Sequence, residues 1–223
     1  MAIAFDAVSH TWGNTVTSLT IAHTCTGSNL VLVVFSLGYS NQTTTGITYN
    51  GVSLTKIVAY KPSIADTFEQ SVWYLLNPAT GANNIIASYS GSGGAWVGGL
   101  SYTGCNTSSQ PDVYGTSTKH NNLTSDSLTL TTNNNDEMIV AGGCKSNALS
   151  SAGSGTTSRY LDNILLNATY GDAVATTAGS NSFNLTFGAG AYDNYIYGIA
   201  LKPYTASTVV IKNIPTLLTL GVG

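Results

Sequence analysis

Apolar residues in this chain recur at every second position in short runs, and no window of a dozen residues keeps them at helical spacing. Segments such as Ile3–Ser9, Ser18–Thr24 and Val52–Tyr60 are rich in β-branched and aromatic residues. Side chains of that kind fit the pleated, half-buried surface of a sheet. The pattern therefore predicts an all-β fold, and we expect an antiparallel β-sandwich.

Two turns and one central strand can be predicted from local signals. Asn50-Gly51 lies between two β-rich runs, and a type I′ hairpin turn needs positive φ at both central positions, which Asn-Gly tolerates best. The stretch Asn77–Gly81 supplies Pro and Gly for a second connection between strands. The run Leu30–Phe35 is apolar without alternation, which predicts a strand covered on both faces.

Two other stretches predict long exposed loops. Residues 106–126 and 146–155 are rich in Ser, Asn, Gly and Thr and contain few large apolar side chains. Segments of that composition bury too little apolar surface to form core strands, and connections of this kind run over the surface.

The composition changes after Tyr204. We expect residues 1–204 to form the β-sandwich domain and residues 205–223 to form a C-terminal assembly arm, which is too apolar to remain fully solvated. The arm either packs back on its own sandwich or adds a strand or an apolar strip to a neighbouring subunit. The side chains that would make this contact are Val209, Val210, Ile211, Ile214, Leu217 and Leu218.

Charge is scarce, and this excludes several classes of partner. The chain has seven Lys and Arg residues against ten Asp and Glu, for a net charge of −3, and Arg159 is its only arginine. A surface without a basic patch does not suit nucleic acid or an anionic membrane. No stretch reaches the roughly 18 to 20 apolar residues of a membrane-spanning helix.

The first residues, Met1 to Asp6, lack the basic region, apolar core and small-residue cleavage site of a secretory signal. The composition is nevertheless that of a surface protein. A virion protein made in the host cytoplasm would reconcile the two observations, and an extracellular or cell-surface protein is the alternative.

Neither a metal site nor a cofactor is expected. Cys25, Cys105 and Cys144 are too few and too widely spaced for a zinc site or a disulfide scaffold, so we expect small buried apolar residues, with one disulfide among them left open. No segment has the regular carboxylate spacing of a calcium loop.

The acidic residues predict no catalytic pair. Asp136 and Glu137 are adjacent, so on a strand their side chains point to opposite faces. Asp172 follows Tyr170-Gly171 and is interpreted as a turn residue whose carboxylate accepts backbone N–H bonds, with a ligand or calcium role as the alternative.

The histidines also lack a catalytic motif. His10 and His23 lie on predicted strands, where we expect them to be hydrogen-bonded within the sheet, and His120 lies in a loop beside Lys119. Since none stands in a nucleophile or metalloprotease motif, no catalytic residue is named and the protein is not expected to be an enzyme.

Aromatic residues offer one possible binding site. Trp73 and Trp96 lie within apolar or glycine-rich strands and are expected in the core. Trp12, Tyr192, Asp193 and Tyr195 are better placed to be exposed. Exposed rings flanked by Asp or Asn suit the faces and hydroxyls of a sugar, so these four residues form a possible glycan-binding site.

Several stretches resemble a recurrent jelly-roll or lectin-like β-sandwich module of phage virion proteins and bacterial surface proteins. They are Ile47–Thr55, Val72–Gly81, Gly99–Gly104, Glu137–Gly143, Gly171–Ala173 and Ile199–Pro203. The resemblance covers most of residues 2–204, implies a sandwich fold and carries no catalytic residue set. The arm lies outside it.

Three functions follow as expectations. The first is a non-enzymatic structural protein of a phage-like virion, such as a capsid decoration, head-fibre or tail component, whose partners are copies of itself and other virion proteins. The second is an adhesin that binds cell-surface glycan. The third is a subunit of an extracellular filament, which would need a contact between copies that does not close into a ring.

Overall fold

The computed structural model describes residues 1–61, 68–117, 124–144, 149–161, 169–187 and 195–205. This part of the chain is all-β with antiparallel pairing, which confirms the predicted fold class. The strands are β1 Ala4–Cys25, β2 Val31–Gly38, β3 Thr44–Tyr49, β4 Val52–Ser53, β5 Thr55–Tyr60, β6 Glu69–Leu76, β7 Gly81–Thr103, β8 Tyr114–Thr116, β9 Ser125–Thr132, β10 Glu137–Cys144, β11 Leu149–Ala152, β12 Thr157–Leu161, β13 Thr169–Ala175, β14 Gly179–Phe187 and β15 Tyr195–Leu201.

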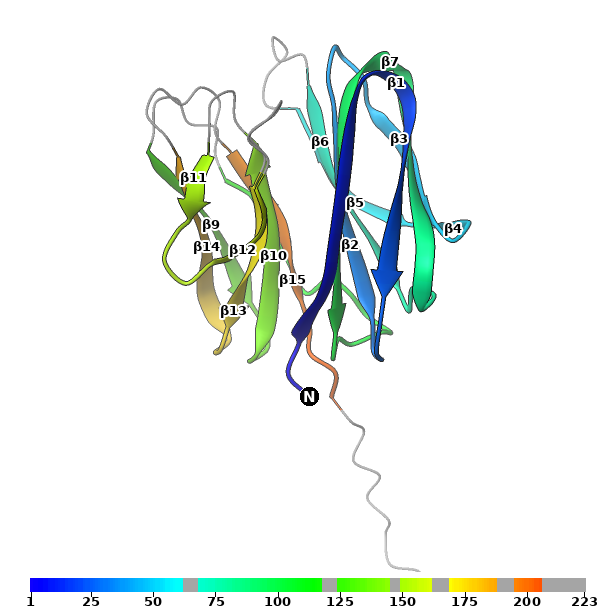
Figure 1. Cartoon of the computed structure of the whole chain (residues 1–223). Helices are drawn as coiled ribbons and strands as arrows, with labels where there is room; N and C mark the ends of the chain where they lie inside the picture. Colours follow the sequence, from blue (N-terminus) through cyan, green and yellow to red (C-terminus); the bar gives the residue numbers. More distant parts are fainter. Residues whose placement is uncertain (62–67, 118–123, 145–148, 162–168, 188–194, 206–223) are drawn as a thin grey trace, which may run out of the picture.

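The first seven strands form one sandwich, which we call the N half. The long strands β1 and β7 pair along their whole length and bend together where their register shifts near Val16 (Figure 1). Residues Ala4–Gly13 of β1 and Ala95–Thr103 of β7 therefore lie in one layer. Residues Ser18–Cys25 of β1 and Gly81–Ser88 of β7 lie in the other. The inner N sheet has the order β5-β6-β2-β7-β1, and the outer N sheet has the order β4-β3-β7-β1.

The remaining strands form a second sandwich, the C half. Its inner sheet has the order β12-β13-β10-β15-β8, and its outer sheet has the order β11-β14-β9. The two inner sheets pack face to face, so the halves stand side by side in Figure 1, with the blue to green strands on the right and the green to orange strands on the left.

Three buried clusters fill the spaces between the four layers. Leu32 and Val34 of β2 point into the N sandwich, whereas Val33 and Phe35 point at the C half. Both faces of β2 are therefore covered, and none of Val31–Phe35 is exposed to solvent, which confirms the prediction for this run. A third cluster around Phe183 fills the C sandwich.

The two halves repeat the same topology. Each strand of the C half has a counterpart with the same neighbours, and the registers agree: Val31 of β2 faces Tyr102 and Leu76, as Met138 of β10 faces Leu201 and Val174. The irregularities repeat as well. The β5–β6 pairing is bulged between Lys56 and Val58, and the β12–β13 pairing is bulged between Ser158 and Tyr160.

A loop contact also recurs in both halves. Thr26 N donates to Asp6 Oδ2 at 3.0 Å in the N half, and Asn133 N donates to Asp112 Oδ2 at 2.8 Å in the C half. The two halves share strand order, register, the position of the bulge and this contact between a backbone N–H and an Asp carboxylate. Together these features indicate an internal duplication. Positions that differ in polarity between the halves therefore mark where each half has become specialised.

Both local turn predictions are confirmed. The hairpin is confirmed, since Tyr49 pairs with Val52 and both Asn50 and Gly51 have positive φ. The stretch Asn77–Gly81 connects β6 to β7, which are not neighbours in the sheet order, so it carries the chain between the two layers of the N half.

The predicted loops over residues 106–126 and 146–155 are wrong in part, because they contain β8, the start of β9 and all of β11. These strands are short or carry Ser and Thr on their outer faces, which hides their periodicity.

Candidate functional site

The end of the sandwich where Met1 lies beside Tyr204 is the first candidate site. The N-terminal amine of Met1 donates to Tyr204 O at 3.2 Å, and Tyr204 N donates to Gly104 O at 2.8 Å. The backbone of Lys202 makes three hydrogen bonds: its N–H donates to Gln110 Oε1 at 2.9 Å, and its carbonyl accepts from Asn106 N at 2.8 Å and from Gln110 Nε2 at 2.9 Å. The root of the C-terminal arm is thus fixed to the linker between the halves.

A polar depression lies beside this root. It has a volume of about 420 Å³ and is lined by Asn106, Asn133, Asn134, Asn135, Lys202, Pro203 and Thr205. Residues 133–135 form the turn between β9 and β10. Because Thr205, the first residue of the arm, lines the same depression, the root of the arm lies next to the C-terminal end of β9.

A buried carboxylate stands behind the depression. Glu137 has no exposed surface, and its Oε1 accepts hydrogen bonds from Asn134 N at 3.0 Å and Asn134 Nδ2 at 2.6 Å. Burial raises the pKa of Glu137 to about 7; the bonds from Asn134 oppose this rise and the nearby Asp112 carboxylate adds to it. The equivalent position in the N half is Leu30, which is also buried.

A chain of hydrogen bonds crosses the N sandwich. Ser9 Oγ lies 2.8 Å from His23 Nδ1, His23 Nε2 lies 3.1 Å from Ser101 Oγ, and Ser101 Oγ donates to Asp6 Oδ2 at 2.6 Å. Because the Asp6 carboxylate only accepts, Ser101 must accept from Nε2–H, which leaves Nδ1 to accept from Ser9. This order of donors assigns the tautomer of His23.

The electrostatic surroundings of His23 favour its neutral imidazole. Burial lowers the pKa of His23 to about 4, and the nearby Asp6 carboxylate opposes that shift. Although burial raises the pKa of Asp6, hydrogen bonds from Ser101 and Thr26 bring it below its usual value. His23 therefore bridges the two sheets as a neutral residue at pH 7, and the expectation that it is hydrogen-bonded on a strand is confirmed.

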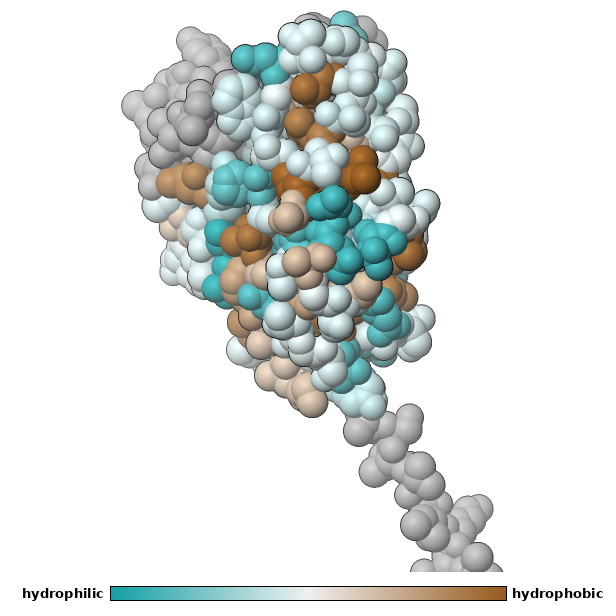
Figure 2. Space-filling model, turned by 45° about the vertical axis from the view of Figure 1, so that its right-hand side comes forward, coloured by the Kyte–Doolittle hydropathy of each residue, from teal (hydrophilic) through white to brown (hydrophobic). Residues whose placement is uncertain are grey.

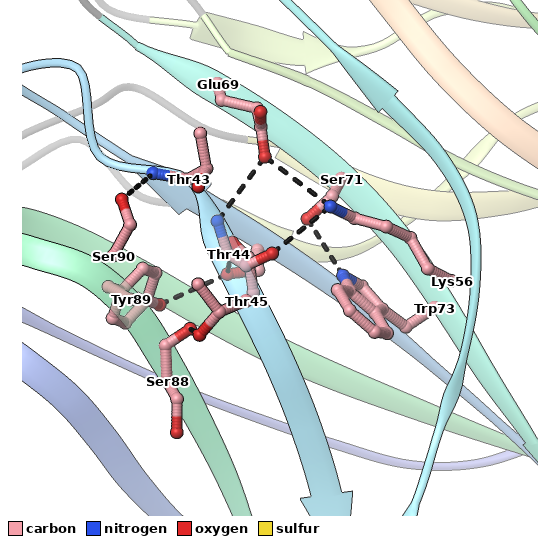
Figure 3. A network of polar contacts seen from close by, with 11 residues as sticks. Thr43, Thr44, Thr45, Lys56, Glu69, Ser71, Trp73, Ser88, Tyr89 and Ser90 are labelled. Atoms are coloured by element: carbon pink, nitrogen blue, oxygen red, sulfur yellow. Dashed lines mark hydrogen bonds and ion pairs between the residues drawn. The ribbon is translucent and has the colours of Figure 1, made fainter.

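Figure 3 shows a second polar network in the N half, between β3 and the edge of the inner sheet. Lys56 Nζ lies 3.7 Å from Glu69 Oε1 and donates to Thr44 O at 3.1 Å, and Thr44 N donates to Glu69 Oε1 at 3.4 Å. Trp73 Nε1 donates to Ser71 Oγ at 2.8 Å beside them. The network pins β3 to β5 and β6, so we assign it a structural role.

The interface between the halves contains the ion pair of the only arginine. Arg159 Nε lies 2.7 Å from Asp172 Oδ2, and Tyr102 OH donates to the same oxygen at 2.9 Å. The interpretation of Asp172 as a turn residue is wrong, because it lies in the middle of β13 with 2% of its surface exposed. Its sequence neighbours Gly171 and Tyr170 suggested a turn, but the strand pairs with β10 and β12 on both sides.

The predicted assembly residues lie outside the described part of the chain. This holds for Val209, Val210, Ile211, Ile214, Leu217 and Leu218. The structure describes their attachment point and not their positions.

The possible glycan site is described only in part. Trp12 lies near the bend of β1 and is 36% exposed. Tyr195 lies in β15, where it pairs with Cys144. Tyr192 and Asp193 fall outside the described residues.

The predicted core tryptophans and two of the cysteines are confirmed. Trp73 and Trp96 are buried, and Cys25 and Cys105 are buried with free thiols. Within the described ranges, no group of three or more His, Cys, Asp or Glu side chains is arranged to hold a metal ion.

Apolar side chains on the visible face form separate spots among pale, weakly polar residues (Figure 2). No helix long and apolar enough to cross a membrane occurs in the part of the chain that the structure describes. Comparisons of the chain with protein-family models, with curated proteins and with solved structures find no match.

Sequence reasoning missed Glu137 and the His23 chain as special positions. Comparison of the halves shows that these polar residues stand where the other half has apolar ones. Glu137 takes the place of Leu30, while His23 and Ser101 take the places of Leu130 and Ala200 of the C half.

Proposed function

We propose that this protein is a non-enzymatic structural component of a phage-like particle, such as a capsid decoration, head-fibre or tail protein, that associates with other copies or docks on the particle through its C-terminal arm. The observation that carries the proposal is the attachment of the arm. The arm, whose large apolar side chains begin at Val209, follows Tyr204 at a root held by Gly104, Gln110 and Met1. A fixed root limits the positions from which the arm extends and so lowers the entropy lost on docking.

The surface supports the same proposal. Strands at the sheet edges carry few charges, and the outer faces of β9 and β14 present Ser, Thr and Asn side chains. Such faces pack against other protein surfaces without burying unpaired charge.

The test is the mass in solution of the full chain and of a chain ending at Tyr204, measured by size exclusion with light scattering. We expect an oligomer for the full chain and a monomer for the shortened one. Equal monomeric masses at high concentration would contradict the proposal.

Trp12 favours an adhesin as the second candidate, because a partly exposed indole at the bend of β1 is a stacking platform of the kind that sugars use. A glycan array tests this candidate. Signals that disappear in Trp12→Ala would support it, and an array without signals would remove it.

A further inference from the structure

The strand β9 ends its sheet without the features that usually protect an edge. Among the described residues it pairs only with β14, through eight consecutive residues without a shift in register. Its one charged residue is Asp126, near its start. Exposed edges normally carry Lys, Pro or a bulge, because free N–H and C=O groups otherwise recruit another strand.

The other edges of the sheets are protected in one of these ways. Strands β4, β8 and β11 have two, three and four residues. The edge strands β5 and β12 carry Lys56 and Arg159, and both are bulged. The edge formed by Ala4–Gly13 of β1 has a bulge between Phe5 and Ala7. Among the described edges that remain, the part of β1 from Ser18 to Cys25, the duplicate of β9, is as long as β9 and pairs without a shift, so it has none of these protections.

The position of the arm distinguishes between these two open edges. Thr205 and Asn133 line the same depression, and Asn133 follows the last residue of β9. When two copies meet about a two-fold axis at this depression, the root of each arm lies beside strand β9 of the other copy. This is the arrangement of an exchanged arm.

The arm has the length and composition for such an exchange. Residues 206–223 number 18, which reach about 60 Å at most when extended, whereas an eight-residue strand spans about 27 Å. The run Thr208–Ile211 is β-branched, and Pro215 ends the stretch in which every N–H can enter a ladder.

We propose that the β9 edge is the acceptor for residues 208–213 of a second copy, which add to it as an antiparallel strand. This inference rests on the proposed function, since it names the surface that receives the arm. Backbone hydrogen bonds would join the arm to β9. In β9, Leu128 and Leu130 lie on the inner face of the strand, and Thr129 and Thr131 lie on the outer face.

Cysteine cross-linking in the full chain tests the inference. Thr129→Cys in one preparation is mixed with Val210→Cys or Ile211→Cys in another, and a short bismaleimide is added. Adjacent strand residues face opposite sides, so we expect one arm position to give roughly ten times more cross-linked dimer than the other, because only one is held close to Thr129.

The matched control is Ala22→Cys, which occupies the position of Thr129 in the duplicate edge of β1 and is exposed in the same way. It should give only the background level. The wild-type protein, which carries Cys25, Cys105 and Cys144, sets that background.

Three results would overturn the inference: equal yields at the two arm positions, a stronger signal from Ala22→Cys, or a cross-link confined to single chains carrying both Thr129→Cys and Val210→Cys. The mass experiment on the shortened chain separates this failure from that of the proposed function. If removal of the arm still dissociates the oligomer while Thr129→Cys in β9 gives no cross-link, the arm assembles the protein through another surface.

Discussion

The indole of Trp96 and the ring of Tyr170 stack across the boundary between the halves, with centroids 4.5 Å apart and planes 7° from parallel. Trp96 comes from β7 of the N half and Tyr170 from β13 of the C half. Phe35 lies against Tyr170 at 4.6 Å, whereas the position equivalent to Phe35 in the C half is Gly142. The Tyr170 ring lies over Gly142 on the neighbouring strand of its own sheet, and Phe35 of the other sheet packs against that ring.

Gly142→Ala is expected to destabilise the protein by about 1 to 3 kcal/mol, because the added methyl group would overlap the Tyr170 ring, which Trp96 and Phe35 hold in place. Urea unfolding measures the loss. The control is Gly46→Ala, whose methyl group would meet no neighbour within 4 Å and should change stability by less than about 0.5 kcal/mol. Equal effects of the two substitutions would contradict the packing argument.

Tyr102→Phe should cost about 1.5 to 3 kcal/mol of unfolding free energy, because it removes a hydrogen bond to the buried Asp172 carboxylate while Arg159 stays in place. The same measurement on Tyr114→Phe is the comparison. Tyr114 is 56% exposed, and its hydroxyl can bond to water. A cost for Tyr102→Phe no larger than that for Tyr114→Phe would show that the hydroxyl does not stabilise the interface.

The pH dependence of stability should contain a term from His23. Its pKa is about 4 in the folded protein and about 6.5 when unfolded, so between these values the unfolded chain binds the extra proton. This contribution is complete above pH 6.5 and is lost as the pH falls to about 4, with a slope of at most about 1.4 kcal/mol per pH unit. His23→Leu, which copies Leu130, should remove that slope. Unfolding of both proteins from pH 4 to 7 measures it, and identical slopes would contradict the assignment.

Glu137 should act in the opposite direction. Its pKa is about 7 when folded and about 4.5 when unfolded, so the folded protein holds the extra proton between these values. The contribution is complete below pH 4.5 and is lost as the pH rises through 7. Glu137→Leu, which copies Leu30, should stabilise the protein by about 1 to 2 kcal/mol at pH 8, since it replaces a buried carboxylate by an apolar side chain and leaves the exposed Asn134 to bond to water.

The two terms oppose each other in the wild-type protein between pH 4.5 and 6.5. Glu137→Leu should therefore lose stability on acidification more steeply than the wild type, whereas His23→Leu should gain stability relative to it. The double variant should follow the wild-type profile more closely than either single variant. Parallel profiles for all four proteins would show that neither group titrates as described.

Local sequence patterns are enough to predict the all-β class, the Asn50-Gly51 hairpin and the burial of Leu30–Phe35, because these depend on local periodicity and on the φ angles that particular residues allow. Composition also separates the apolar arm from the rest of the chain.

Only the tertiary structure revealed the duplication. Of the seven paired positions Val31–Leu37 and Met138–Cys144, only Val33 and Val140 carry the same residue. Sheet register depends on which strands meet and which faces are buried, and many apolar side chains satisfy both conditions, so the two sequences diverged while the backbone pairing stayed the same. The strand position of Asp172 and the burial of Glu137 depend on partners far along the chain, which no local pattern contains.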